Sequence, residues 1–240
     1  MCKSVILVMS FTPFLHLRAV IEESMKISEG FLAELIKVGN RTRFSPGDKI
    51  LREGDPPEGV ILLLEGRVKV TMAREDGKSY LLGIVEHIET LGATGVLSAT
   101  NRSCTVTAMT SCRGHRIMAD HFLAVVKNAE FGCEMQQQAF CRVAESNIWH
   151  ATTSACTADI KLCRALLRFA RPRPDGLHSV EHITHEEIAS SVGLSRQMID
   201  RELRFLRDAG VIRTAQKSVV ILEMGRLILL AEQGRRRAHS

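Results

Sequence analysis

Hydrophobic and polar positions alternate over short stretches between residues 41 and 116 of this 240-residue chain. The apolar runs are separated by turns that contain glycine, such as Glu65-Gly66 and Asp76-Gly77, which is typical of β-hairpins. Several short strands at regular spacing predict an antiparallel sandwich or roll with no helix inside it. We expect its strands at Val60–Leu64, Val68–Met72, Tyr80–Val85 and Thr105–Ala108.

The hydrophobic period lengthens to that of helices after Met118. Residues 119–127 predict a short helix, and residues 129–158, which contain no proline, predict a long one. Its apolar stripe is either a core-facing side or a coiled-coil-like seam against a second copy, where small residues allow close approach. Thr157 and Asp159 are candidate caps that predict a break near its end. The stripe consists of Phe140, Ala144, Ile148, Ala151, Ala155 and Ala158.

The segment 184–212 predicts two helices joined by a tight turn. Thr184 and Glu187 have the spacing of a capping box at the start of the first helix. Gly193 supplies the turn, and Ser195 can cap the second helix. The buried side of this second helix is predicted by Ile199, Leu203 and Leu206.

The outward side of the second helix is rich in arginine. Arginine and glutamine can make bidentate contacts to base edges in the major groove of DNA. The segment is therefore either a DNA-binding helix-turn-helix or an ordinary helical pair with a solvated charged face. Around it we expect a helix at 161–170, a turn at 171–176, a hairpin wing at 213–222 and a closing helix near 224–232. The outward residues are Arg196, Gln197, Asp200, Arg201 and Arg204.

The excess of positive over negative charge lies entirely in the C-terminal third of the chain. Residues 1–158 contain 17 basic and 17 acidic residues, whereas residues 159–240 contain 15 basic and 10 acidic ones. This distribution indicates a polyanionic partner for the C-terminal third and a different task for the rest. The run 235–237 is expected to be a frayed tail that could also touch phosphate.

The seven cysteines are an odd number without a CxxC pair, which favours a reducing cytoplasm over a disulfide framework. The apolar start of the chain lacks a clear signal-peptide cleavage site and is too short to span a membrane, so we expect an N-terminal arm that packs on the body. The sequence contains no nucleophile–base motif, metal-ligand spacing or phosphate loop that would indicate an enzyme. We therefore expect a cytoplasmic protein without a membrane partner.

In chain order, the predicted elements are a strand roll, a long helix, a break and a winged helix-turn-helix. This order resembles the bacterial CRP/FNR family, the cyclic-AMP receptor protein and its relatives, over nearly the whole chain. Leu91-Gly92 followed by residues 101–106 is similar to the family's phosphate-binding cassette, and residues 192–201 are similar to its recognition-helix motif. The roll's glycine framework is matched by Phe44, Gly47, Asp48, Gly54, Asp55, Leu64, Gly66, Val68, Val70 and Gly77.

The resemblance implies an α+β fold and a homodimeric transcription regulator that binds a palindromic operator. Residues 1–128 would form the N-terminal arm and a cyclic-nucleotide-binding-like jelly roll that senses a signal. Residues 129–158 would be the dimerisation helix, and residues 159–240 the winged helix-turn-helix domain. RNA polymerase would be a further partner if the protein is an activator. The expected dimer interface consists of Phe140, Ala144, Ile148, Ala151 and Ala155.

By match to the family's motif, Arg196, Gln197 and Arg201 occupy the base-contacting positions of the recognition helix. Arg196 is the candidate for a bidentate contact to guanine. Phosphates would be held by Thr184, His185 and the wing around Lys217. With Ser195 and Asp200, these residues make up the predicted DNA-binding surface. The alternative is a signal-binding or scaffold protein that uses the helix-turn-helix for protein contacts.

The effector of the roll is unknown, and cyclic AMP is not expected. Ala93 stands where cyclic-nucleotide binders carry a glutamate for the ribose hydroxyl, and a methyl group cannot accept a hydrogen bond. Arg102 either binds a phosphate or carboxylate or is a framework residue paired to a local acid or carbonyl. Asn147, together with Ser146, could reach an effector or could lie in the helix seam. The candidate effector residues are Gly92, Arg102, Ser103 and Asn147.

Other sensing chemistries have little support in the sequence. An iron–sulfur cluster is not expected because only Cys2 lies near the N-terminus. Haem, which needs a pair of axial ligands, is not expected, since the candidate His87 is a lone loop residue that we expect to be an ordinary surface histidine. The pairs Cys133 and Cys141, and Cys156 and Cys163, are spaced to share helix faces. They predict buried packing, with a thiol switch as the minority alternative.

Overall fold

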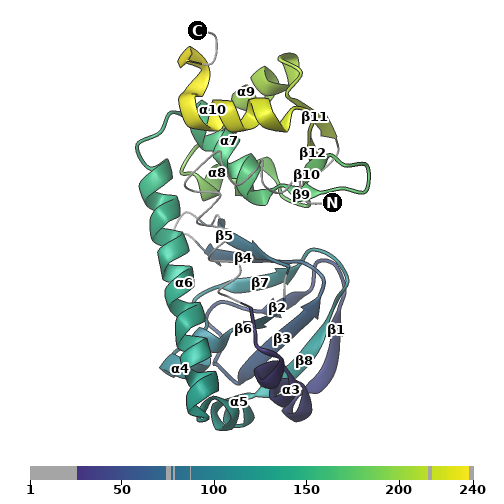
Figure 1. Cartoon of the computed structure of the whole chain (residues 1–240), viewed down its shortest axis with the longest axis vertical. Helices are drawn as coiled ribbons and strands as arrows, with labels where there is room; N and C mark the ends of the chain where they lie inside the picture. The colour runs from purple at the N-terminus through teal and green to yellow at the C-terminus, as the bar shows by residue number, and fades with distance from the viewer. Residues whose placement is uncertain (1–25, 74–76, 78, 87, 216–217, 238–240) are drawn as a thin grey trace. The chain divides into compact units, whose positions relative to one another are not determined.

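The computed structural model describes residues 26–237 except residues 74–76, 78, 87, 216 and 217 (Figure 1). The chain divides into two compact units, and the boundary falls inside helix α6, between Ala144 and Glu145. The predicted N-terminal arm, Cys2, Asp76, His87 and Lys217 lie outside the described residues. The same holds for the side chains of residues 235–237.

The N-terminal unit contains two four-stranded antiparallel sheets that form a roll. One sheet has the strand order β1-β8-β3-β6 and the other the order β2-β7-β4-β5. The predicted strands are confirmed to within one residue at either end. The elements are α3 (Glu29–Val38), β1 (Asn40–Phe44), β2 (Lys49–Leu51), β3 (Gly59–Glu65), β4 (Val68–Ala73), β5 (Ser79–Val85), β6 (Glu89–Leu91), α4 (Ala93–Ser98), β7 (Thr105–Ala108), β8 (Cys112–Met118) and α5 (Ala119–Val126).

Strand β3 is apolar on both faces because each face packs against a different hydrophobic cluster. Ile61 and Leu63 belong to a cluster that includes Val68 and Val106 of the other sheet. Val60 and Leu62 point the other way and pack with residues of α3, α4, α5 and α6. Successive strand residues point to opposite faces, so the continuous run Val60–Leu63 requires this double cover.

The prediction that the roll contains no helix is wrong, because α4 lies between β6 and β7. Its six residues are too few to show a helical period in the sequence. Gly92 precedes it with a φ of 82°, a left-handed conformation that glycine adopts without strain.

Helix α6 (Ala129–Thr153) ends five residues before the predicted end at Ala158. The hydroxyls of Thr152 and Thr153 donate to the carbonyls of Ile148 and Trp149, one turn earlier. The Thr152 carbonyl accepts hydrogen bonds from the Arg164 guanidinium and the Cys156 thiol instead of continuing the helix. One local and one more distant partner of this carbonyl therefore mark the end of α6, and the predicted break is confirmed.

The apolar stripe of α6 is correspondingly shorter than predicted. Ala155 lies in the turn after the helix, and Ala158 is the first residue of α7. The assignment of Ala155 to the helix stripe is therefore wrong. Phe140, Ala144 and Ile148 remain on the helix, with Ala151 in its last turn.

The C-terminal unit is a helical domain with a small antiparallel sheet of strand order β11-β12-β10-β9. Strands β9 and β10 were not predicted; β10 pairs with β12 of the wing on one edge and with β9 on the other. Helix α10 extends five residues beyond the expected end at residue 232. The elements are α7 (Ala158–Phe169), β9 (Arg171–Pro172), β10 (His178–Glu181), α8 (His185–Ser191), α9 (Arg196–Asp208), β11 (Ile212–Ala215), β12 (Ser218–Ile221) and α10 (Met224–Arg237).

The last turns of α6 pack within the C-terminal unit through Trp149. Its side chain is 3% exposed, and its indole nitrogen donates to the carbonyl of Ser191, the last residue of α8, over 3.3 Å. The Arg168 guanidinium lies 4.4 Å from the centre of the Trp149 ring and also bonds Glu145 at 3.2 Å. The cation–π contact and the ion pair hold α6 to α7, and the indole hydrogen bond holds it to α8.

Gln138 is a buried polar residue on the side of α6 that faces the N-terminal unit. It is 1% exposed, and it lies between Met135, which contacts Thr90, and Arg142, which bonds Glu89. Among the groups that the structure describes, neither its amide oxygen nor its amide nitrogen has a hydrogen-bond partner. An unpaired buried amide destabilises the folded state by roughly 1–3 kcal/mol.

We expect Gln138→Leu to raise the free energy of unfolding by about 1–3 kcal/mol, because leucine has a similar size and no unpaired polar atom. Urea denaturation followed by circular dichroism measures this change. Gln138→Glu is the matched comparison and should destabilise the protein, since it buries a charge in the same space. A lower stability of Gln138→Leu would show that the amide has a stabilising partner.

Candidate functional site

The start of α8 has the capping box that the sequence predicts. The Thr184 hydroxyl accepts from the Glu187 amide at 3.1 Å, and the Glu187 carboxylate accepts from the Thr184 amide at 2.9 Å. Both bonds satisfy amide groups that have no partner within the helix. They fix the point at which the chain enters the helix-turn-helix.

The turn between α8 and α9 also follows the sequence. Gly193 has a φ of 66°, and the Leu194 amide donates to the Ala189 carbonyl at 3.0 Å. Ser195 then caps α9 by accepting from the Met198 amide at 3.2 Å. These bonds set the angle at which α9 leaves the turn.

One side of α9 is buried and the opposite side is exposed. Ile199, Leu203 and Leu206 are at most 3% exposed, as predicted. The side chains of Arg196 and Arg201 are 66% and 68% exposed. Gln197 and Arg204 are exposed beside them, so the outward face presents three guanidinium groups and one amide.

Asp200 is the acidic residue of the outward face, and its carboxylate lies between two side chains of the protein. One oxygen lies 2.5 Å from Nδ1 of His185, the first residue of α8. The other lies 3.6 Å from Nε of Arg196, one helical turn earlier. The structure thus brings together three residues that the sequence assigned separately to DNA binding.

The wing is formed by β11 and β12, which pair from Ile212–Ile221 to Ala215–Ser218. Lys217 lies outside the described residues, so the predicted phosphate contact of the wing stays a prediction. The structure adds Arg213, an exposed residue of β11 that was not among the predicted DNA-binding residues. Its place on the outward side of a two-residue alternation was the signal that could have identified it.

In the roll, Arg102 is a buried residue whose guanidinium bonds backbone carbonyls. It is 7% exposed and donates to Gly92 O at 2.6 Å and to Gly59 O. A Cβ at Gly92 would lie 2.5 Å from Arg102 Nη1, so only glycine leaves room for this side chain. Burial lowers the pKa of Arg102, while the nearby charges of Cys104, Asp55 and Glu58 oppose this shift.

Of the candidate effector residues, Gly92 contacts Arg102 through its carbonyl, whereas the other two side chains are exposed. Ser103 is exposed, and Ala93 is 2% exposed in the cluster on the outer face of the roll's first sheet. Asn147 is exposed on the part of α6 that belongs to the C-terminal unit. The geometry within the N-terminal unit matches the framework alternative for Arg102, in which it pairs with local carbonyls.

Helix α6 carries an exposed apolar strip opposite its buried side. Phe140 is 73% exposed and Val143 is 56% exposed, whereas Met135 and Gln138 are buried. A shallow groove of about 480 Å³ runs along this strip. Its lining residues are Cys133, Gln136, Gln137, Phe140, Cys141 and Ala144.

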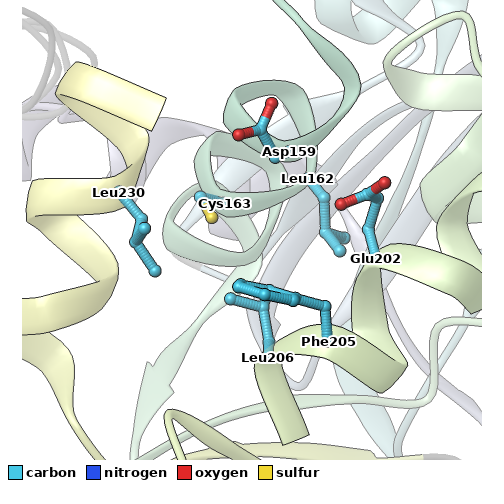
Figure 2. Close-up of a pocket in the computed structure, with 7 residues that line it drawn as sticks. All are labelled: Asp159, Leu162, Cys163, Glu202, Phe205, Leu206 and Leu230. Carbon is cyan, nitrogen blue, oxygen red and sulfur yellow. The ribbon is translucent and has the colours of Figure 1, made fainter. Parts of the chain in front are cut away.

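A small cavity lies between α7, α9 and α10 (Figure 2). Its lining includes Asp159 and Glu202 together with the side chains of Phe205 and Leu206. Its volume of about 10 Å³ leaves room for at most about one water molecule, so it is too small to hold a metabolite.

The remaining chemistry of the described residues is sparse. Their six cysteines are free, and burial raises the pKa of the Cys104 and Cys112 thiols. Within the same residues, no group of three histidine, cysteine or acidic side chains could hold a metal ion. None of their helices is long and apolar enough to cross a membrane.

Comparison with known proteins assigns a family model to each unit. The cyclic nucleotide-binding domain matches residues 41–129, and the Crp-like helix-turn-helix domain matches residues 160–230. The chain is 25% identical over 201 residues to the CRP-like cAMP-activated global transcriptional regulator of Mycobacterium tuberculosis, covering 82% of this chain and 90% of that protein. It is 24% identical over 179 residues to the cAMP-activated global transcriptional regulator CRP of Salmonella typhimurium. This match covers 72% of this chain and 84% of that protein.

Solved structures show the same fold. A CRP/FNR family transcriptional regulator from Thermus thermophilus is similar with a TM-score of 0.68 and 23% identity, over 82% of this chain and 100% of that chain. The c-di-GMP-responsive global regulator CLP of Xanthomonas campestris is similar with a TM-score of 0.68 and 19% identity. This match covers 81% of this chain and 99% of that chain.

The order of the two domains defines a transcription regulator with a roll of the cyclic nucleotide-binding type and a DNA-binding helix-turn-helix. The chain belongs to the CRP/FNR family, whose members are transcriptional regulators that bind DNA and act as dimers. The fold class predicted from the sequence is confirmed.

Proposed function

We propose that this protein is a homodimeric, sequence-specific transcription regulator whose roll responds to a signal other than cyclic AMP. The observation that carries the proposal is the exposed arginine face of α9, which begins at a capped turn and stands opposite a fully buried stripe. An α-helix with such a face fits the major groove of DNA. The charge excess of the C-terminal third favours the same polyanionic partner.

In this proposal Arg196, Gln197 and Arg201 contact base edges. Arginine suits the O6 and N7 acceptors of guanine, and glutamine suits the N6 and N7 groups of adenine. Thr184, His185 and Lys217 would position the protein on phosphates, and Arg213 of the wing is a further candidate for that role. Neutralised phosphates release counterions, so binding should weaken steeply with salt.

We expect Arg196→Ala to reduce affinity for the selected operator roughly 5- to 150-fold, the value of one bidentate base contact. Binding to random DNA should change much less. Fluorescence anisotropy with the operator obtained by selection from random duplexes, at several salt concentrations, measures both affinities.

Arg207→Ala is the matched control, because Arg207 is an exposed arginine in the last turn of α9 that bonds Asp208. It should leave operator preference unchanged. An equal loss of specific and non-specific binding in Arg196→Ala would place Arg196 on phosphate. If the wild-type protein selects no duplex under any salt condition, protein contacts become the better explanation of the helix-turn-helix.

The second copy would be bound through the exposed strip of α6. Phe140 and Ala144 lie on the helix side opposite Met135 and Gln138, and Ala151 continues the strip at a spacing that suits a helix seam. A symmetric pair of recognition helices would contact half-sites about one helical turn apart, roughly 34 Å. RNA polymerase would be a further partner if the protein activates transcription.

We expect the wild-type protein to have twice the mass of one 26.7 kDa chain by light scattering. Phe140→Glu should raise the dimer dissociation constant more than about 100-fold, because it buries an unpaired charge that costs several kcal/mol. Ala139→Glu introduces the same charge one residue away, beside the strip, and should remain a dimer. A monomeric wild-type protein would contradict the dimer proposal.

Two residues of the roll argue against cyclic AMP as its effector. The guanidinium of Arg102, which would hold a cyclic phosphate, bonds two carbonyls of its own roll. Ala93 offers no acceptor for a ribose hydroxyl, and its methyl group is buried. Both observations support a signal other than cyclic AMP.

Isothermal titration calorimetry should therefore detect no binding of cyclic AMP at concentrations below about 1 mM, which corresponds to less than roughly 4 kcal/mol of binding free energy. Tight binding that is lost in Arg102→Leu, in a variant that still melts cooperatively, would overturn this expectation. It would show that Arg102 exchanges its carbonyl partners for the ligand.

A further inference from the structure

We infer that Asp200 is a positioning residue of the recognition surface: held by His185, its carboxylate orients Arg196 toward guanine. This inference rests on the proposed function of α9. It assigns to Asp200 a different role from that of a base-contacting residue, and it connects the two helices of the motif through one side chain.

The geometry places Asp200 between two cationic or hydrogen-bonding groups. His185 Nδ1 lies 2.5 Å from one carboxylate oxygen, and Arg196 Nε lies 3.6 Å from the other. Each oxygen therefore faces a different partner. Arg196 and Asp200 are four residues apart on α9, the spacing at which side chains lie on the same side of a helix.

Contact through Nε determines which nitrogens of Arg196 remain available. The guanidinium is a planar fork with five N–H donors. When Nε faces Asp200, the two terminal nitrogens point away from the carboxylate and can donate together to guanine O6 and N7. The contact also restricts a long side chain that is otherwise 66% exposed, so less of its freedom is lost when DNA binds.

His185 keeps the carboxylate in this position. It is the first residue of α8, so its bond to Asp200 joins the beginning of one helix to the middle of the recognition helix. Without it, the Asp200 side chain could turn toward solvent and leave Arg196. The Arg196 guanidinium also offsets the negative charge of Asp200 on a surface that would face phosphates.

A direct contact of Asp200 with the amino group of cytosine is the competing role. Asp200 is less suited to it than its neighbours, since its side chain is 38% exposed against 66% for Arg196 and 68% for Arg201. Both of its oxygens already face protein groups. The two roles affect different operator positions, and the experiment separates them.

The test compares operator preference of the wild-type protein with Asp200→Ala and Arg196→Ala, using duplexes selected by the wild type and substituted one base pair at a time. We expect Asp200→Ala to reduce the preference for guanine about tenfold, within the range of one bidentate contact, at the same base pair that Arg196→Ala affects. Its affinity for random DNA should rise, because a negative charge is removed from the surface. Asp200→Asn, which keeps one acceptor oxygen, should retain part of the preference.

Asp208→Ala is the matched control. It removes the same charge from the last residue of α9, where Asp208 bonds Arg207. It should raise affinity for random DNA without any loss of preference at single base pairs. His185→Asn should weaken the preference at the Arg196 position by a smaller factor than Asp200→Ala, because it removes only the support of the carboxylate.

Three outcomes would overturn the inference. Unchanged preference in Asp200→Ala would show that Arg196 needs no positioning. A loss at a different base pair would assign Asp200 to direct base contact, and an equal loss at every base pair would assign it a purely structural role. Failure of the wild-type protein to select any operator would instead contradict the proposed function itself.

Discussion

A single helix, α6, has to satisfy two hydrophobic cores, and both units of the molecule depend on it. Its Met135 packs in the N-terminal unit, and its Trp149 is buried in the C-terminal unit. Two ion pairs mark the change from one to the other. Arg142 bonds Glu89 of the roll, and Glu145, one turn later, bonds Arg168 of α7. The boundary between the units falls between these two residues and not at a loop.

This constraint explains why the side chains of α6 show no simple amphipathic pattern. Its inner side changes from thioether and amide groups beside the roll to an indole beside the helix-turn-helix, while its outer side keeps an exposed strip around Phe140. The assignment of residues 129–158 to a separate dimerisation domain therefore stays a prediction. The first part of the helix packs with one unit and its last turns with the other.

Local signals predicted much of this fold. The capping box at Thr184, the turn at Gly193 and the buried stripe from Ile199 to Leu206 each depend on residues a few positions apart, and the structure has all three. Helix α4 was missed because six residues show no period. The end of α6 was placed too late because its stop is set by Arg164, which lies eleven residues beyond Thr153.

The candidate site was predictable only in part, because some of its contacts join residues that are far apart in the chain. The outward residues of α9 follow from its buried stripe, whereas the partner of Asp200 lies 15 residues earlier in the chain. The carbonyls that hold Arg102 belong to Gly92, which lies in the same cassette, and to Gly59, which lies 43 residues earlier and outside it. Long-range contacts of this kind decide whether a charged side chain faces a ligand or its own backbone.

Trp149 is the only tryptophan in the 240 residues, and this gives the contact between α6 and α8 a property of its own. The ultraviolet emission of the whole protein comes chiefly from one indole, which is stacked against a guanidinium and bonded to the carbonyl of Ser191. Separation of these groups would expose the ring to water and change its emission. The joint between the long helix and the helix-turn-helix is thus spectroscopically visible in the unlabelled protein.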